Sequence, residues 1–112
     1  MDMDVRESGN TCTIRLKGRL VREAVDQFDA AVRSAQGNGC SFLILDLEGS
    51  SYIDSCGIGA IVSALRTATQ LGGSVQLVKL SSFAEKTFKM CGILGLFGVY
   101  QSEAEAISAC SV

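Results

Sequence analysis

The sequence predicts an α/β fold with one mostly parallel sheet of about five strands and four helices, in the order β-β-α-β-α-β-α-β-α. Two observations predict it. From residue 11 onward, stretches with strand periodicity alternate with stretches of helix periodicity, and glycine alone punctuates them because proline is absent. Such alternation implies parallel strands joined by right-handed crossovers. A length of 112 residues suits a single domain spanning residues 1–112.

The first two strands are expected to form a hairpin. Residues 3–7 and 11–17 flank the turn-prone triplet Ser8-Gly9-Asn10. In the second stretch polar and apolar residues alternate, which is typical of a strand with one buried face. The first strand therefore adds an antiparallel edge to an otherwise parallel sheet.

Helix and strand signals then alternate along the chain. Residues 22–36 carry apolar side chains at helical spacing and are followed by Gly37 as a C-cap. Residues 42–47 are nearly continuously apolar, as in a strand buried on both faces. Residues 58–71 read as a second helix, and residues 75–80 as the next strand.

The C-terminal third contains two candidate capping boxes, Ser82-x-x-Glu85 and Ser102-x-x-Glu105. The first opens a helix, and the second opens a last helix that runs to about residue 109. Residues 96–100 form a short strand between them. All phenylalanines are expected in the core: Phe28, Phe42, Phe83, Phe88 and Phe97.

Composition excludes several functional classes. A net charge of -2 and a pI near 5.0, with no basic run, argue against nucleic-acid binding. The chain has no histidine, which removes His-based catalysis and the commonest metal ligand. We therefore expect no enzyme, no catalytic residues, no metal and no cofactor. No apolar run is long enough to insert directly into a membrane, and the acidic N-terminus lacks a secretory segment, so a cytoplasmic location is expected.

The cysteines indicate a reducing compartment rather than a disulfide framework. Their number is odd, and no Cys-x-x-Cys pair occurs. Four of the five are expected to be small buried apolar residues. The five are Cys12, Cys40, Cys56, Cys91 and Cys110.

The most informative stretch is residues 46–61. A buried strand ends at Leu47, a short polar loop follows, and Tyr52-Ile53 is expected to return to the core before residues 54–57 open a helix. A helix start has unpaired N–H groups and a positive dipole end, which receive a phosphate well. Gly57 and Gly59 would keep this surface flat for a partner's backbone. The alternative is an ordinary N-cap at this position.

The same stretch resembles the signature of STAS domains, the family of anti-sigma-factor antagonists and sulfate-transporter tails. The likeness extends through nearly the whole chain, including Gly18 and Leu20 before the first helix, Cys91-Gly92-Ile93, and Leu96-Phe97. The matching signature residues are Asp46, Leu47, Ile53, Asp54, Ser55, Gly57, Ile58 and Gly59.

The resemblance implies a regulatory protein that binds a kinase-type anti-sigma factor and so releases a sigma factor. In the family, that kinase phosphorylates the second residue after the aspartate, and the added charge breaks the interface. A protein partner is therefore expected, together with a weak homodimer. The residues expected to bind the partner are Asp54, Ser55, Cys56, Gly57, Ile58, Gly59, Ser63 and Arg66.

Two departures from the family pattern affect this site. Cys56 stands where the family has its phosphoacceptor, and Val21 stands where an acidic residue usually lies close to it. We therefore expect the phospho-switch to be absent. Three interpretations of this position remain open. Cys56 is a small residue that fills the interface, or Ser55 accepts the phosphate in its place, or Cys56 is a redox-sensing thiol. The alternative function is an accessory subunit of a membrane complex that transports lipids or anions.

Overall fold

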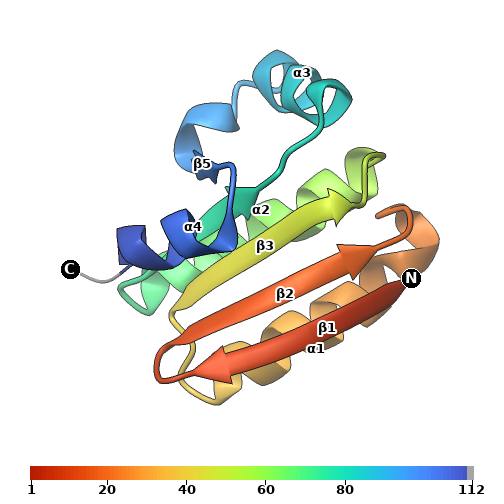
Figure 1. Cartoon of the computed structure of the whole chain (residues 1–112). Helices are drawn as coiled ribbons and strands as arrows, with labels where there is room; N and C mark the ends of the chain where they lie inside the picture. Colours follow the sequence, from red (N-terminus) through yellow and green to blue (C-terminus); the bar gives the residue numbers. More distant parts are fainter. Residues whose placement is uncertain (111–112) are drawn as a thin grey trace.

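The computed structural model describes residues 1–110 as a five-stranded sheet with helices on both faces (Figure 1). The strand order is β1-β2-β3-β4-β5, with β1 antiparallel to β2 and every other pair parallel. The predicted fold class and element order are confirmed. The strands are β1 (Asp2–Ser8), β2 (Thr11–Lys17), β3 (Phe42–Gly49), β4 (Ser74–Val78) and β5 (Gly98–Tyr100).

Two long helices cover one face of the sheet, and one short helix covers part of the other (Figure 1). The long helices are α1 (Val25–Gly37) and α2 (Ser55–Gln70), which pack against each other. The short helix α4 (Glu103–Cys110) contacts β3, β4 and β5. Helix α3 (Ser82–Met90) and the 3-10 turns η1 (Arg22–Ala24) and η2 (Leu94–Leu96) complete the described chain.

The main core lies between the sheet and the pair α1 and α2. Because side chains alternate along a strand, every second residue of β2, β3 and β4 points into it. The hairpin predicted from Ser8-Gly9-Asn10 is confirmed, with Ser8 opposite Thr11. The strand residues in this core are Cys12, Ile14, Leu16, Leu43, Leu45, Leu47, Val75 and Leu77.

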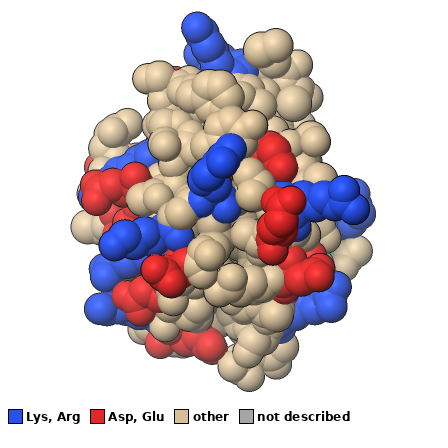
Figure 2. Space-filling view, turned by 90° about the vertical axis from the view of Figure 1, so that its right-hand side faces the viewer, with Lys and Arg blue, Asp and Glu red and all other residues tan. Residues whose placement is uncertain are grey.

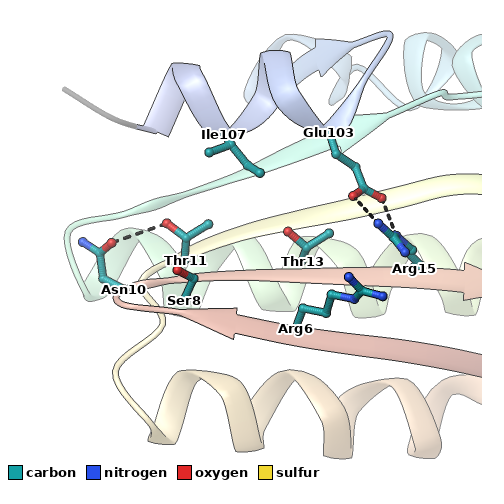
Figure 3. Close-up of a pocket in the computed structure, with 8 residues that line it drawn as sticks. All are labelled: Arg6, Ser8, Asn10, Thr11, Thr13, Arg15, Glu103 and Ile107. Carbon is teal, nitrogen blue, oxygen red and sulfur yellow. Dashed lines mark hydrogen bonds and ion pairs between the residues drawn. The ribbon is translucent and has the colours of Figure 1, made fainter.

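The face that α4 covers has a much smaller apolar cluster, formed by Ile44, Val78 and Ala106. A groove of about 470 Å³ runs beside it between the hairpin and α4 (Figure 3). At one end of the groove, the guanidinium of Arg15 donates two hydrogen bonds to Glu103, at 2.7 and 2.9 Å. This ion pair connects the first residue of α4 to β2.

Several predicted boundaries were wrong. Gly37 is the last residue of α1 and not its C-cap, which is Asn38. The strand predicted over 75–80 ends at Val78 because Lys79 has a φ of 56°, in the left-handed region. The strand predicted over 96–100 is shorter because residues 94–96 form η2. The cap of α3 is Ser81, whose hydroxyl accepts from the Ala84 N–H at 3.1 Å, and not Ser82.

The expectation of four buried cysteines was wrong. Cys12 and Cys40 are buried, Cys110 is half-buried, and Cys56 and Cys91 are exposed. Burial raises the pKa of the Cys12 thiol to about 12, which keeps that thiol protonated and unreactive. Across residues 1–110, the structure contains no helix with both the length and the apolar character needed to cross a bilayer.

Candidate functional site

The loops that follow β2 and β3 run side by side at the carboxyl ends of these two strands. The Gly18 N–H donates to the Gly49 carbonyl at 3.0 Å, and the Leu20 N–H donates to the Tyr52 carbonyl at 3.1 Å. A single bridge pairs Leu20 with Ile53, which is buried as predicted. Tyr52 does not return to the core; 39% of it is exposed. The two loops, residues 18–20 and 49–53, are therefore tied together next to the start of α2, and we call them the platform.

Asp54 fastens the start of α2 to this platform. Its side chain accepts from the Gly57 N–H at 2.9 Å and from the Arg22 N–H at 3.1 Å. These donors, and the positive charge of Arg19, lower the pKa of the Asp54 carboxyl and keep it ionised. Val21, which directly precedes Arg22, therefore lies at the same helix start.

Four residues of the predicted partner-binding set share one exposed side of α2. Cys56, Gly59, Ser63 and Arg66 are all exposed, and their spacing of three, four and three residues places them on one helix face. We call this row the α2 stripe. Ser55, the first helical residue, is also exposed beside the stripe.

Gly57 and Ile58 belong to the interior of the molecule and not to its surface. Both are buried, and a Cβ on Gly57 would overlap the Leu20 carbonyl oxygen and the Ile53 side chain. The expectation that Gly57 flattens an outer surface was therefore wrong, because its missing side chain lets the loop and α2 pack together. Gly59 differs, since nothing lies within 4 Å of the position a Cβ would take.

An aromatic cluster beside the helix start was missed. Tyr52 and Phe83 stack with ring centroids 5.5 Å apart, and the Arg19 guanidinium lies 4.6 Å from the Tyr52 centroid. Phe83 is 54% exposed, so its assignment to the core was wrong. Periodicity could have revealed this, because Ala84 and Phe88 are the buried i, i+4 pair of α3 and Phe83 falls outside their face.

The aromatic cluster is held in place by a hydrogen bond between loops. The Ser81 hydroxyl donates to the Ser51 carbonyl at 2.9 Å, which ties the start of α3 to the loop that carries Tyr52. Figure 2 shows this end of the molecule. The upper part of that face, which α3 forms, is mostly uncharged below a basic tip, and charged side chains gather in the lower half. Exposed stacked aromatics of this kind are typical of protein-binding surfaces.

Within residues 1–110, no group of three or more His, Cys, Asp or Glu side chains is arranged to hold a metal ion. The site brings together a capped helix start, the α2 stripe and the aromatic cluster. It offers small side chains and flat apolar rings.

Comparisons with known proteins agree with this architecture. An anti-sigma F factor antagonist of Lysinibacillus sphaericus is 33% identical over 108 residues, covering 96% of this chain and 89% of the relative. The anti-sigma factor antagonist SpoIIAA in its unphosphorylated form is 27% identical, with a TM-score of 0.85 and coverage of 96% and 95%.

A more distant likeness extends to a membrane protein. The murine Solute Carrier 26 family member A9 anion transporter matches 95% of this chain with 18% of its own, at 20% identity and a TM-score of 0.79. That likeness concerns the fold alone. The family model of the STAS domain matches residues 2–106, and this chain belongs to the STAS domain family.

Proposed function

We propose that this protein is an anti-sigma-factor antagonist that binds a kinase-type anti-sigma factor and so releases a sigma factor. The protein acts in the cytoplasm by binding and not by catalysis. The observation that carries the proposal is the exposed helix start of α2, capped by Asp54 and flanked by the Tyr52–Phe83 stack. It stands where the family signature lies, and the relatives at 33% and 27% identity are named antagonists.

The contacts at the site support a protein partner over a small ligand. The α2 stripe is shallow, because Cys56, Gly59 and Ser63 are small. Beside it, Tyr52 and Phe83 offer rigid apolar area with little side-chain entropy to lose on binding. Arg19 over the Tyr52 ring adds a fixed positive charge. These features suit a second protein surface laid across both elements.

We propose further that the partner is not released by phosphorylation at Cys56. SpoIIAA has structures in both an unphosphorylated and a phosphorylated form, whereas this chain has a thiol at the corresponding signature position. The neighbouring Asp54 is held ionised and accepts from the N–H groups of Gly57 and Arg22. A phosphate on Cys56 or Ser55 would therefore meet a carboxylate at a helix start whose donors are already partly used.

Binding to a kinase-fold anti-sigma factor from the same genome, measured by calorimetry, tests the proposal. We expect binding by the wild type and a loss of at least about tenfold in the Cys56→Asp variant, since a carboxylate there places charge in the interface. A negative charge in the first turn favours the helix, so this variant should stay folded. Leu71→Ala, an exposed change at the other end of α2, is the matched control and should bind like the wild type.

Incubation of the complex with ATP, followed by mass spectrometry, tests the missing switch. We expect no phosphate on Cys56 or Ser55. Phosphate on Ser55 would refute this part while leaving the partner assignment intact. The Cys56→Ser variant should be phosphorylated only in part, because Val21 leaves the family's acidic neighbour missing; full phosphorylation would show that Val21 is irrelevant.

The second candidate is an accessory subunit of a membrane complex that transports lipids or anions. The thiol at position 56 favours it, because such a subunit needs no phosphoacceptor. Purification of the tagged protein from its native membranes would distinguish the two. Recovery of a transport ATPase or channel with no anti-sigma factor would replace the first proposal.

A further inference from the structure

Strand β1 has an unusually open outer edge. It is the first strand of the sheet, and within residues 1–110 no strand pairs with its other side. Six of its seven residues are exposed, and it contains no proline and no bulge. A long regular edge of this kind is normally avoided, since its free N–H and C=O groups pair readily with another strand.

The hairpin register determines which backbone groups face outward. Gly9 and Asn10 form a two-residue turn with a φ of 61° at Gly9, so Ser8 and Thr11 are its closing, hydrogen-bonded pair. From Ser8 toward the N-terminus, every second residue of β1 then forms backbone hydrogen bonds with β2. The N–H and C=O groups of Met3, Val5 and Glu7 therefore point away from the sheet.

We propose that this edge binds the β1 edge of a second copy, antiparallel, about a two-fold axis through Val5. With this axis, the outward-facing backbone groups of Val5 pair with those of Val5 in the second copy. Those of Met3 pair with those of Glu7 in the second copy. The axis also places Asp4 directly opposite Arg6 of the second copy, and Arg6 opposite Asp4. The result is a continuous sheet across two protomers with a self-complementary interface.

The charges on β1 select this register. If the axis is centred one residue earlier, Asp4 faces Asp4, and one residue later Arg6 faces Arg6. Like charges directly opposite each other on neighbouring strands are destabilising, whereas opposite charges stabilise the pair. Asp4 and Arg6 fall in the non-hydrogen-bonded positions of the interface, where side chains approach most closely. Only the register centred on Val5 pairs the whole strand without a like-charge contact.

The side chains needed for this contact are accessible. Val5 is 41% exposed, so α1 does not cover the middle of the strand on that face. Within its own chain, Asp4 pairs with Arg6 at 3.3 Å and with Arg15 at 3.5 Å. The side chains of Asp4 and Arg6 are both more than half exposed, so their pair is readily exchanged. The interface is narrow compared with stable dimers, and the association is weak and reversible. It leaves the Tyr52–Phe83 cluster of each copy free, because that cluster lies on other elements.

Sedimentation velocity over a range of protein concentrations tests the proposal. We expect a concentration-dependent dimer for the wild type and a monomer for Val5→Pro, which removes an outward N–H that a sheet edge can spare. A wild type that stays monomeric to millimolar concentration overturns the proposal. A dimer that survives Val5→Pro with unchanged affinity does so as well.

A charge exchange separates contacts between chains from contacts within one chain. Asp4→Arg alone and Arg6→Asp alone should each dimerise about tenfold more weakly, because the two-fold axis repeats the like-charge contact. An equimolar mixture of these two variants should recover wild-type affinity as a heterodimer, since each Arg then faces an Asp. A mixture as weak as the separate variants refutes this register. Circular dichroism melts of each variant confirm that it is folded.

Discussion

The two faces of the sheet are built from neighbouring residues yet differ in chemistry. On β3, Leu45 points into the large core under α1 and α2, while the next residue, Asp46, points toward α4. The buried residues under the two long helices form one large apolar cluster. Among residues 1–110, the face under α4 has three buried apolar residues in its cluster. It also contains the buried Asp46 and the half-buried Glu103, which forms an ion pair with the exposed Arg15.

The two faces of the sheet therefore contribute to the structure in different ways. Apolar burial is non-directional and supplies most of the folding free energy. A bidentate ion pair such as Arg15–Glu103 contributes less, but it fixes where α4 sits. The large core therefore stabilises the platform and α2, whereas polar contacts set the position of the last helix. Changes on the two faces should differ in size and in their dependence on pH.

Truncating adjacent residues of β3 tests the difference directly. Leu45→Ala should destabilise the fold by about 4 kcal/mol, because α1 and α2 pack against each other as well as on the sheet and cannot move to close the cavity. Ile44→Ala, on the α4 face, should cost about 2 kcal/mol, because one short helix can move to fill the space. Both residues are fully buried, so burial alone predicts equal effects. Urea denaturation measures both, and equal losses would contradict the comparison.

Removing the charge of Glu103 should have a smaller effect that depends on pH. Arg15 lowers the pKa of the Glu103 carboxyl to about 2. A carboxyl with a lowered folded pKa adds stability above its unfolded pKa and loses that contribution as the pH falls through the folded value. Glu103→Gln should therefore cost about 1 kcal/mol at pH 7.

This cost should diminish below pH 4.5 and disappear near pH 2, as urea denaturation across that range would show. Glu23→Gln, at an exposed residue of η1, is the control and should change little at any pH. A cost for Glu103→Gln that is the same at pH 7 and pH 3 would show that the ion pair does not hold α4.

Sequence periodicity predicted the main architecture for a physical reason. The alternation in β2 and the helical spacing in α1 are large-scale burial patterns, and burial decides which face a residue takes. The errors lie where one residue changes the outcome. Lys79 ends β4 through a left-handed backbone conformation, and the residue that caps α3 is Ser81, one position before the expected serine. Neither follows from average propensities.

The candidate site was predictable in position but not in content. The residues at the start of α2 were identified, and Asp54 is its cap. The roles of Gly57 and Phe83 were not, because each depends on a segment distant in sequence. Gly57 is needed for its contact with Leu20, and Phe83 pairs with Tyr52 across two loops. Such contacts follow from the tertiary structure and leave no local pattern.

The loop that follows β3 buries one polar residue, Ser50. This residue is fully buried, and among the described residues its hydroxyl is the one buried side-chain polar atom without a hydrogen-bond partner. Burying an unpaired hydroxyl is unfavourable, so Ser50→Ala should stabilise the protein by about 1 kcal/mol. The exposed neighbour Ser51→Ala is the control and should change the melting temperature little. A loss of stability in Ser50→Ala would show that the hydroxyl has a partner in solution, such as a water molecule.

Replacing Asp46 should have the smallest effect on stability. The sign of that effect tests the face under α4 most closely. Burial and a hydrogen bond shared with Glu103 raise the pKa of the Asp46 carboxyl, although the Glu48 N–H donates to it at 3.0 Å. A raised folded pKa means that the ionised form costs stability at neutral pH and that this cost is relieved as the pH falls through the folded value. Asn keeps the acceptor for Glu48 and offers Glu103 a donor, so Asp46→Asn should gain about 0.5 kcal/mol at pH 7. The gain should be smaller at pH 4 than at pH 7, because a lower pH favours the proton on the native Asp46. Urea denaturation at both values measures it, and a variant less stable than the wild type at pH 7 would mean that the charge of Asp46, and not its hydrogen bonds, is what the α4 face requires.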